Sequence, residues 1–392
     1  MSQHIYFDNS ATTPFDPRVV DAMRSALTHD FANPSSLHQP GREARQAIDT
    51  ARQQVALLLN ADPQEIIFTA SGTEADNMAL IGVVEGLNET GIHIITSAFE
   101  HPAVLETCRY LERRGITVTY LPVTEDGLIQ PEVLKAALRP ETRLVSIMAA
   151  NNVVGTLQPI TELAQITHNH GALFHTDAVQ AVGKFPLDMR IQLIDLLSLS
   201  AHKLHGPKGI GALFIRKGVQ IRPLVHGGGQ ESGLRSATEN VAGIVGLGCA
   251  AEIARSEMSA EAARLVKLRD RLIDGITRAV PNAYLIGHPF RRLPGHICLG
   301  LANQEGEAIR LLMALDEAGI AVSTGSACSA QHGAEPSYIL RAMGFDPVRA
   351  RGSIRITLGR FNTDAEVSHF LEVFPPIAAA LRPTLSRFTS IA

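Results

Sequence analysis

Short apolar runs alternate with helical patterns between residues 40 and 225. Six runs have the length and β-branched content typical of buried strands, and they cover residues 65–70, 93–98, 144–150, 172–178, 195–201 and 211–216. Helical patterns lie between several of them, at 73–87, 102–115 and 161–171. This alternation predicts a mostly parallel sheet with helices on both faces. Thr73 is the predicted N-cap of the helix at 73–87, because acidic residues follow it in the first turn.

The last third of the chain predicts a second, smaller α/β unit. The pattern from about 240 to 280 stays helical, and apolar runs at 296–301, 319–324 and 353–359 predict strands. No Pro/Gly/Ser-rich linker separates the two parts, so we expect them to pack closely. We assign residues 15–258 to a large domain, and residues 1–14 and 259–392 to a small domain.

Composition narrows the class of protein. A chain of 392 residues with 45% hydrophobic content can bury a large core. A formal charge of -4 gives no electrostatic reason to expect nucleic acid or an anionic membrane as a partner. No apolar run approaches the roughly 18 to 20 residues of a membrane span, and the start lacks a targeting pattern. We therefore expect a soluble, cytoplasmic protein of enzyme size.

The four cysteines lie far apart, without the spacing of a metal site or a disulfide framework. This usage favours a reducing compartment and predicts no metal centre. The apolar surroundings of three cysteines predict buried thiols, at Cys108, Cys249 and Cys298. Cys328 differs, because it lies among Gly, Ser, Ala, Gln and His in "STGSACSAQHGAEPS".

Polar side chains follow the predicted strands at their carboxyl ends, where open parallel sheets bind ligands. "SGTEADN" follows the first strand, and its small residues lead into a helix N-terminus that suits a phosphate. The ends of four other strands carry an imidazole, an amide, a carboxylate and an imidazole–amine pair, at His101, Asn152, Asp177 and His202-Lys203. Together they predict one polar site.

Lys203 is one of only six lysines, and it directly follows an apolar run. A lysine at the mouth of an apolar site can form a Schiff base with an aldehyde cofactor. Pyridoxal phosphate (PLP) needs such a lysine, a carboxylate facing its ring nitrogen, here Asp177, and a phosphate pocket. The candidate phosphate contacts are Gly72, Thr73, Ser200 and His202. Spacing alone leaves open that Lys203 is a solvated loop cation, and that Lys208 is the reactive lysine.

Two other motifs carry less weight. "HNHG" at 168–171 could indicate a metal site, but a polar helix end with a glycine C-cap explains it better. The glycine-rich "HGGGQESG" at 226–233 fits neither the dinucleotide-binding nor the P-loop spacing.

Ten ordered segments resemble the NifS/IscS-type cysteine desulfurases, PLP enzymes of the class V aminotransferase group. They include "FDNSATTP", "NPSSLH", "FTASGTEADN", "HTDAVQAVGK", "SLSAHKLHGPKGIG", "STGSACSA" and "SIRITLGR", and they extend to about Arg360. The resemblance implies the PLP type I fold. In that fold a large α/β domain holds a mostly parallel seven-stranded sheet, and a small C-terminal α/β domain follows.

The resemblance also implies roles for individual residues. Lys203 would hold the cofactor covalently, Asp177 would pair with the pyridinium nitrogen, and Gln180 would bind the phenolic oxygen. His101 would stack on the ring and help to move protons. The remaining cofactor contacts would be Thr73, Ser200 and His202 at the phosphate, Asn152 beside the ring, and Thr238 from the partner subunit of a homodimer.

For the substrate, the resemblance implies that Asn33 and Arg355 grip the carboxylate of L-cysteine, with Arg360 as a lower-ranked alternative. The thiolate of Cys328 would attack the substrate sulfur, release L-alanine and keep a persulfide. An acceptor such as an iron–sulfur scaffold protein would then take the sulfur for clusters, thio-cofactors or tRNA. "NNVVG" has Val153 where the family often has an acidic residue, and we assign that position no catalytic role.

Two rival functions remain at this point. A PLP-dependent cystine or selenocysteine lyase of the same fold needs no thiol at Cys328. A non-catalytic assembly scaffold needs none of the site, and the intact set of Lys203, Asp177, His101 and Arg355 argues against it. The segment after Cys328 is slightly longer than the common family form, which bears on the choice of acceptor.

Overall fold

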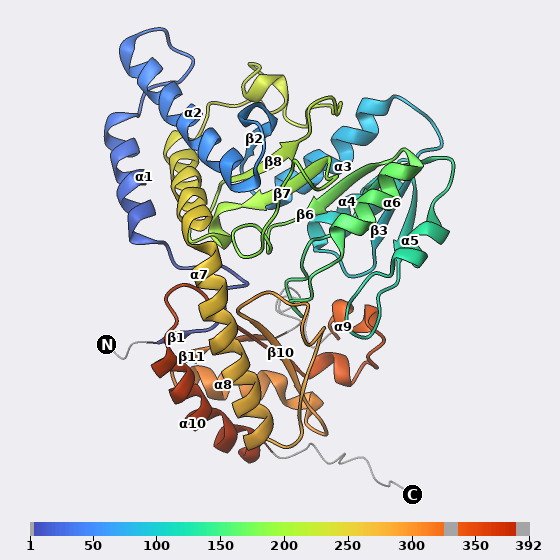
Figure 1. Ribbon diagram of the computed structural model, residues 1–392, viewed down its shortest axis with the longest axis vertical. Coiled ribbons are helices and arrows are strands. Elements are labelled where there is room, and N and C mark those ends of the chain that lie inside the picture. The colour runs from blue at the N-terminus through green and yellow to red at the C-terminus, as the bar shows by residue number, and fades with distance from the viewer. Residues whose placement is uncertain (1–3, 325–335, 382–392) are drawn as a thin grey trace, which may run out of the picture.

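The structure is a computed structural model that describes residues 4–324 and 336–381. A seven-stranded sheet with its helices forms the upper part in Figure 1, and two smaller sheets lie below it. The long helix α7 (Val241–Ala279) runs through both parts. The expected large and small α/β units are therefore present and in contact.

The large sheet is mostly parallel, as predicted. Its strand order is β2-β8-β7-β6-β5-β3-β4, and only β8 runs antiparallel to its neighbours. The strands are β2 (Ile66–Thr69), β3 (His93–Ser97), β4 (Thr117–Leu121), β5 (Thr142–Ser146), β6 (Leu173–Asp177), β7 (Leu196–Ser200) and β8 (Gly211–Ile215). The six predicted strands are all found. The seventh, β4, was missed because it is an edge strand whose residues are mostly half-exposed.

Helices cover both faces of this sheet, and several begin at cap residues that later matter for the site. They are α1 (Pro17–His29), α2 (Gln39–Leu59), α3 (Gly72–Leu87), α4 (Pro102–Glu112), α5 (Pro131–Ala137) and α6 (Ile160–His170). The predicted N-cap of α3 was wrong by two residues. Ser71 caps the helix, because its side chain accepts a hydrogen bond from Glu74 N–H, and Thr73 lies in the first turn.

The "HNHG" motif forms the end of α6, as predicted. Gly171 is the C-cap with a φ of 92°, and glycine adopts this left-handed conformation without a steric cost. Nε2 of His168 lies 2.7 Å from an Asp195 carboxylate oxygen.

The small part contains a four-stranded antiparallel sheet, ordered β12-β13-β10-β9, and the parallel pair β1-β11. The strands are β1 (Ile5–Tyr6), β9 (Ala283–Leu285), β10 (His296–Leu301), β11 (Ile320–Ala321), β12 (Ser323–Thr324) and β13 (Ser353–Thr357). The single strand expected at 319–324 is instead two short strands in different sheets. Ile320 pairs with Ile5, whereas Ser323 pairs with Arg355, so the chain changes partner at Val322.

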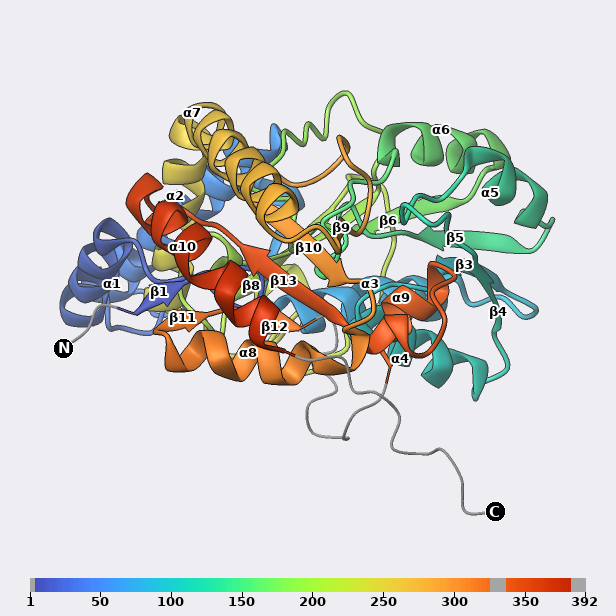
Figure 2. The same cartoon turned by 90° about the horizontal axis from the view of Figure 1, so that it is seen from below.

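Helices of the small part lie across its sheets, and α10 lies beside α7 (Figure 2). They are α8 (Ala308–Glu317), α9 (Tyr338–Ala342) and α10 (Asp364–Ala380). Within residues 4–324 and 336–381, no helix combines the length and apolarity needed to cross a bilayer.

The core changes along α7. Its residues up to Ala251 pack with the large sheet, whereas Leu265 and later residues pack with the small sheets. The segment with β1 also packs into the small part, through Ile5 and Phe7. Both observations support our proposed division of the chain into residues 15–258 and the remainder.

Candidate active site

A cavity of about 360 Å³ lies at the carboxyl edge of the seven-stranded sheet, facing the small part. Ten of the predicted site residues line it: Gly72, Thr73, His101, Asn152, Asp177, Gln180, Ser200, His202, Lys203 and Arg355. They come from six separate segments of the chain. The fold therefore brings together a set of side chains that the sequence could only suggest one strand end at a time.

Strand ends and helix starts position the catalytic candidates. Asp177 is the last residue of β6, and Lys203 ends the short 3₁₀ helix η2 (Ala201–Lys203) that follows β7. His101 follows β3 and caps α4, because its Nδ1 accepts a hydrogen bond from Ala103 N–H at 3.1 Å. This contact leaves the proton of the neutral ring on Nε2. Burial lowers the pKa of His101, with Lys203 acting in the same direction, whereas Asp177 opposes the shift.

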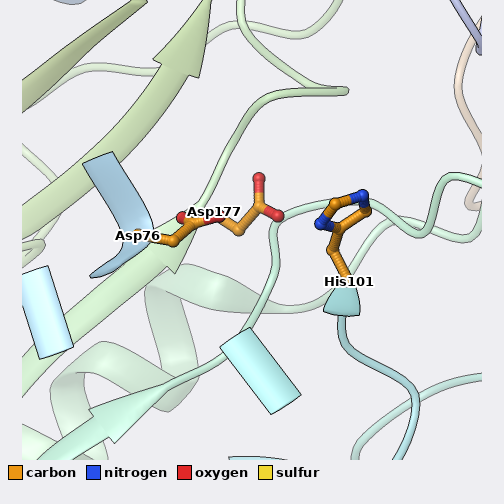
Figure 3. A group of neighbouring side chains, drawn as sticks. All are labelled: Asp76, His101 and Asp177. Carbon is orange, nitrogen blue, oxygen red and sulfur yellow. The ribbon is translucent and has the colours of Figure 1, made fainter. Parts of the chain in front are cut away.

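Asp76, Asp177 and His101 all line the cavity and lie close together (Figure 3). One ligand atom each from Asp76, His101 and Asp177 lies within 4.8 Å of the others. One oxygen of Asp177 accepts a hydrogen bond from Val179 N–H at 2.9 Å. Burial, followed by the nearby Asp177, raises the pKa of Asp76 well above its usual range. Burial also raises the pKa of Asp177, but His101 and Lys203 oppose this shift.

These opposing effects assign the charges within the pair. Two adjacent carboxylates in a buried site do not both ionise readily, and Asp177 is the one beside the Lys203 amine and the His101 ring. We therefore infer that Asp76 is the protonated member of the pair and that Asp177 is the anion. A protonated carboxyl is a poor metal ligand, so this trio suits a positively charged ring nitrogen beside Asp177 better than a metal ion.

Two further buried polar residues, His175 and Glu100, lie near Asp76. Ring nitrogens of His175 lie 2.8 Å from Ser146 Oγ and 3.0 Å from Ser198 Oγ, and burial lowers the pKa of this histidine to about 3. Glu100, next to His101 in the chain, accepts hydrogen bonds from Ser97 Oγ at 2.5 Å and from Met148 N–H at 3.0 Å. Burial raises the pKa of Glu100 to about 8.

Lys203 reaches across the cavity toward the N-terminal segment. Its Nζ donates to the backbone carbonyl oxygens of Ser10 at 2.5 Å and Ala11 at 2.7 Å. The Ser10 carbonyl also accepts a hydrogen bond from Gln180 Nε2 at 2.9 Å. Lys208, the alternative lysine, is exposed and does not line this cavity. The geometry therefore favours Lys203.

The corner suited to a phosphate lies where α3 begins. Gly72 is required there by close approach, because a Cβ on it would lie 2.6 Å from Val179 Cγ2. Free N–H groups of the first helical turn suit an anion, and the hydroxyl groups of Thr73 and Ser200 lie on the same wall. His202 contributes a neutral ring, since burial and the neighbouring Lys203 lower its pKa to about 4.

Arg355 comes from β13 of the small part. Its Nη1 donates to the Asn152 backbone carbonyl at 2.9 Å, and its Nη2 forms an ion pair with Asp8 at 2.7 Å. Arg360, the lower-ranked alternative, does not line the cavity. It forms an ion pair with Glu257 and lies 3.6 Å from Asp16. The geometry therefore favours Arg355 as the ligand of a substrate carboxylate.

Two predicted residues, Asn33 and Thr238, do not line the cavity in the described single chain. Asn33 lies exposed between α1 and α2, where its side chain accepts a hydrogen bond from Ser35 N–H. Its role at the substrate carboxylate stays a prediction. Thr238 lines a different cavity with Thr69 and Arg235, and its expected role involves the partner subunit. Cys328 lies outside the described residues.

Several cavity residues were missed by sequence reasoning. Asp76 belongs to "SGTEADN", but nothing in the pattern distinguishes it from a solvated helix residue. Ser10 and Ala11 act through backbone carbonyls, which leave no sequence signal. The remaining missed lining residues are Ser71, Met148 and Val179. Among the three cysteines predicted to be buried, Cys108 and Cys298 are buried, but Cys249 is only partly buried.

Two residues of the "NNVVG" motif, Asn151 and Val153, are packed in the interior, whereas Asn152 lines the cavity. Asn151 is fully buried, donating to Phe99 O and accepting from the N–H groups of Val153 and Val154. Val153 packs in an apolar cluster, which explains why an apolar residue is tolerated there. Asn152 lines the cavity instead.

The residues present fit PLP. Within the described part of the chain, Asn152 Oδ1 and Arg355 Nε are buried without a hydrogen-bond partner, and both residues line the cavity. Unpaired buried polar atoms are costly and indicate a ligand that completes them. A lysine amine, an anionic carboxylate and an N-terminal helix turn in one cavity match the aldehyde, ring nitrogen and phosphate of this cofactor.

Comparisons with known proteins agree with this site. The sequence profile of the family "Aminotransferase class-V" matches residues 5–370. "Cysteine desulfurase IscS" of Dictyoglomus turgidum is 49% identical over 382 residues, covering 97% of this chain and 96% of that protein.

Solved structures agree as well. A structure titled "NIFS-LIKE PROTEIN" superposes with a TM-score of 0.90 at 42% identity, covering 96% of this chain and 99% of the other. "SspA in complex with cysteine" superposes with a TM-score of 0.81 at 38% identity, covering 92% and 100%. With a profile match over nearly the whole chain and relatives of this similarity, the protein belongs to the class V aminotransferase family, in its NifS/IscS-type cysteine desulfurase group.

Proposed function

We propose that this chain is a PLP-dependent cysteine desulfurase. It converts L-cysteine to L-alanine and leaves the sulfur as a persulfide on Cys328. The observation that carries this proposal is the single cavity shared by Lys203, Asp177, His101 and Arg355. The naming of relatives as cysteine desulfurases, and a structural relative titled as a complex with cysteine, support the substrate.

The roles of the residues follow from their positions. PLP, when bound, draws electrons from the amino acid through its protonated ring. Asp177 keeps that ring nitrogen protonated, because it is the anionic member of the carboxyl pair. Lys203 would hold the cofactor aldehyde, and His101 would face the ring, where its Nε2–H could give a proton.

Substrate binding falls to the small part. The guanidinium of Arg355 suits the planar carboxylate of an amino acid. The ion pair with Asp8 holds the arginine in place before the substrate arrives. Arg355 therefore selects an amino acid over an amine that lacks the carboxylate.

Sulfur transfer to Cys328 needs no oxidant or reductant besides the substrate and the cofactor. The Cys328 thiolate attacks the sulfur of the substrate, the carbon–sulfur bond breaks, and the carbon takes up a proton to give alanine. The sulfur remains as a persulfide on Cys328 until an acceptor thiolate takes it. An iron–sulfur scaffold protein is the kind of acceptor we propose, with thio-cofactors and tRNA as further destinations.

A homodimer is part of this proposal. Large apolar side chains are exposed on the segment between α1 and α2 and just before it, at Leu27 (65%), Phe31 (76%) and Leu37 (90%). Clustered exposure of this kind is typical of an interface. We propose that Thr238 reaches the cofactor phosphate of the partner subunit, and light scattering of the purified protein tests the dimer.

The function is tested by brief exposure of the purified holoprotein to L-cysteine, followed by mass spectrometry and amino-acid analysis. We expect one added sulfur on Cys328, with alanine formed in equal amount. Cys328→Ser serves as the control and should form neither. Pyruvate and free sulfide, or alanine formed unchanged by the Cys328→Ser protein, would contradict the persulfide reaction and favour a lyase.

A further inference from the structure

Lys184 is a cationic residue beside the cofactor cavity that the proposed function leaves unused. It follows β6 and lines a second cavity of about 60 Å³, which lies between α7, the segments after β6 and β7, and the ends of β10 and β13 in the small part. This smaller cavity shares three lining residues with the larger one, namely Ser10, Gln180 and Lys203. Although the Lys184 side chain as a whole is partly exposed, its amine is enclosed by protein.

The amine of Lys184 donates a hydrogen bond from Nζ to Gln180 Oε1 at 3.4 Å. An ammonium group can only donate, so it must meet the oxygen of the Gln180 amide and not its nitrogen. At the other end of that amide, Nε2 donates to the Ser10 carbonyl at 2.9 Å. The Ser10 carbonyl is also the acceptor for Lys203. The two lysines are thus connected through one side-chain amide and one backbone carbonyl.

No carboxylate in the described part of the chain forms an ion pair with Lys184. The acidic residue that lines the same cavity, Glu261, is paired with Arg264 at 2.6 Å. The other titratable groups around the cavity are cationic or basic: Lys203, His205, His296 and Arg360. Burial, and then repulsion by Lys203, lower the pKa of Lys184 to about 7. An enclosed amine without a counter-ion is costly to keep, which points to a task at the site.

We propose that Lys184 is a positioning residue for the cofactor: it fixes the Gln180 amide with its donor end toward the cofactor cavity and places a positive charge close to Lys203. Both effects disfavour an added proton on the Lys203 nitrogen. A neighbouring cation repels that proton, and a donor aimed at the cofactor phenolic oxygen stabilises the anionic form of that oxygen. This inference rests on the proposed roles of Lys203 and Gln180.

The test is the pH dependence of the visible absorbance of the PLP-loaded protein, which reports protonation of the nitrogen joined to the cofactor without any turnover. In Lys184→Met we expect the midpoint of the absorbance change to move up by about one pH unit, since a donor is lost and, below the pKa of Lys184, a charge is lost as well. Lys184→Arg keeps both and should return the midpoint at least halfway. Lys184→Gln retains a polar end for the enclosed site and is measured in parallel, in case the methionine variant does not fold.

Lys208→Met is the matched control. Lys208 is exposed and lies five residues after Lys203. The substitution therefore removes one lysine charge from the same region of the chain. Solvent screens exposed charges, and we expect this midpoint to move by less than about 0.3 unit.

The outcomes separate the inference from the proposed function. A midpoint in Lys184→Met or Lys184→Gln that equals that of the unaltered protein, with PLP still bound, would overturn the inference alone. An equal shift in Lys208→Met would also overturn it, because any nearby charge would then suffice. An absorbance band that survives in Lys203→Ala would overturn the cofactor assignment and the inference together.

Discussion

The two sheets contribute very unequally to the cavity between them. Segments at the carboxyl edge of the seven-stranded sheet supply the acidic, imidazole and amine groups, whereas the described strands of the four-stranded sheet supply Arg355 alone. Parallel strands end side by side, so helix starts and strand ends gather at one edge. Neighbouring antiparallel strands end at opposite edges of the sheet, so their carboxyl ends do not gather at one edge. The large sheet therefore builds the cofactor chemistry, and the small sheet adds the contact that recognises the substrate.

The largest loss of activity is expected from a substitution at Asp177, on the large-sheet side of the cavity. Asp177→Asn removes the anion that keeps the ring nitrogen protonated, and we expect kcat with L-cysteine to fall by at least about 10²-fold. The measurement is alanine formation under saturating PLP and L-cysteine, with bound cofactor quantified by absorbance.

Asp76→Asn is the matched control for that prediction. Asp76 is equally buried in the same cavity, but it holds the shared proton, so an uncharged amide replaces an uncharged acid. We expect less than about a tenfold loss, because a single lost hydrogen bond is worth about 1 kcal/mol. Equal losses in the two variants would contradict our assignment of the charges.

A smaller effect is expected from the small sheet. Arg355→Lys keeps the charge but loses the planar fork, and we expect KM for L-cysteine to rise by about 10- to 100-fold with little change in kcat. Cofactor absorbance should stay as in the unaltered protein, because Arg355 belongs to the substrate side. Loss of bound PLP in this variant would show that Arg355 also holds the cofactor, which contradicts its assignment to the substrate alone.

The smallest effect concerns stability at the edge of the large sheet. The pKa of Glu100 is raised to about 8 in the folded state, above its ordinary value of 4.5. The folded state therefore holds more protons than the unfolded state between these values, and the contribution of Glu100 to stability falls as pH rises through that window. The slope is at most about 1.4 kcal/mol per pH unit.

Glu100→Gln removes this pH-dependent contribution to the free energy of unfolding. We expect the free energy of unfolding of the variant, minus that of the unaltered protein, to increase from pH 5 to pH 8 in urea titrations. Glu106→Gln, on the exposed face of α4, is the control for loss of a carboxylate at the surface. A difference that stays flat or decreases with pH would show that Glu100 is ionised in the fold.

Much of the large sheet was predictable, because buried strands are continuous apolar runs and their ends are marked by polar residues. β4 was not, since a half-exposed edge strand carries no such run. The split at Val322 was not predictable either, because it depends on two strands distant in sequence, β1 and β13. Local patterns do not contain long-range pairing.

The same limit applies to the site. Residue type and position after a strand indicated Asp177 and Lys203, but Arg355 and Gln180 were reached only through resemblance. Asp76 and Lys184 were missed, since their importance comes from enclosure by other segments. Asn33 was also reached only through a motif match, and its role stays a prediction because the described single chain does not bring it to the cavity.

The most direct test of the central claim is borohydride reduction of the PLP-loaded protein, followed by peptide mapping. Reduction fixes the cofactor to the lysine that holds it. Because we propose that Lys203 holds the cofactor, we expect a pyridoxyl group on Lys203 and on no other lysine. A label on Lys184 or Lys208, or a cofactor that washes away after reduction, would contradict the assignment of the cavity at the edge of the large sheet as the catalytic site.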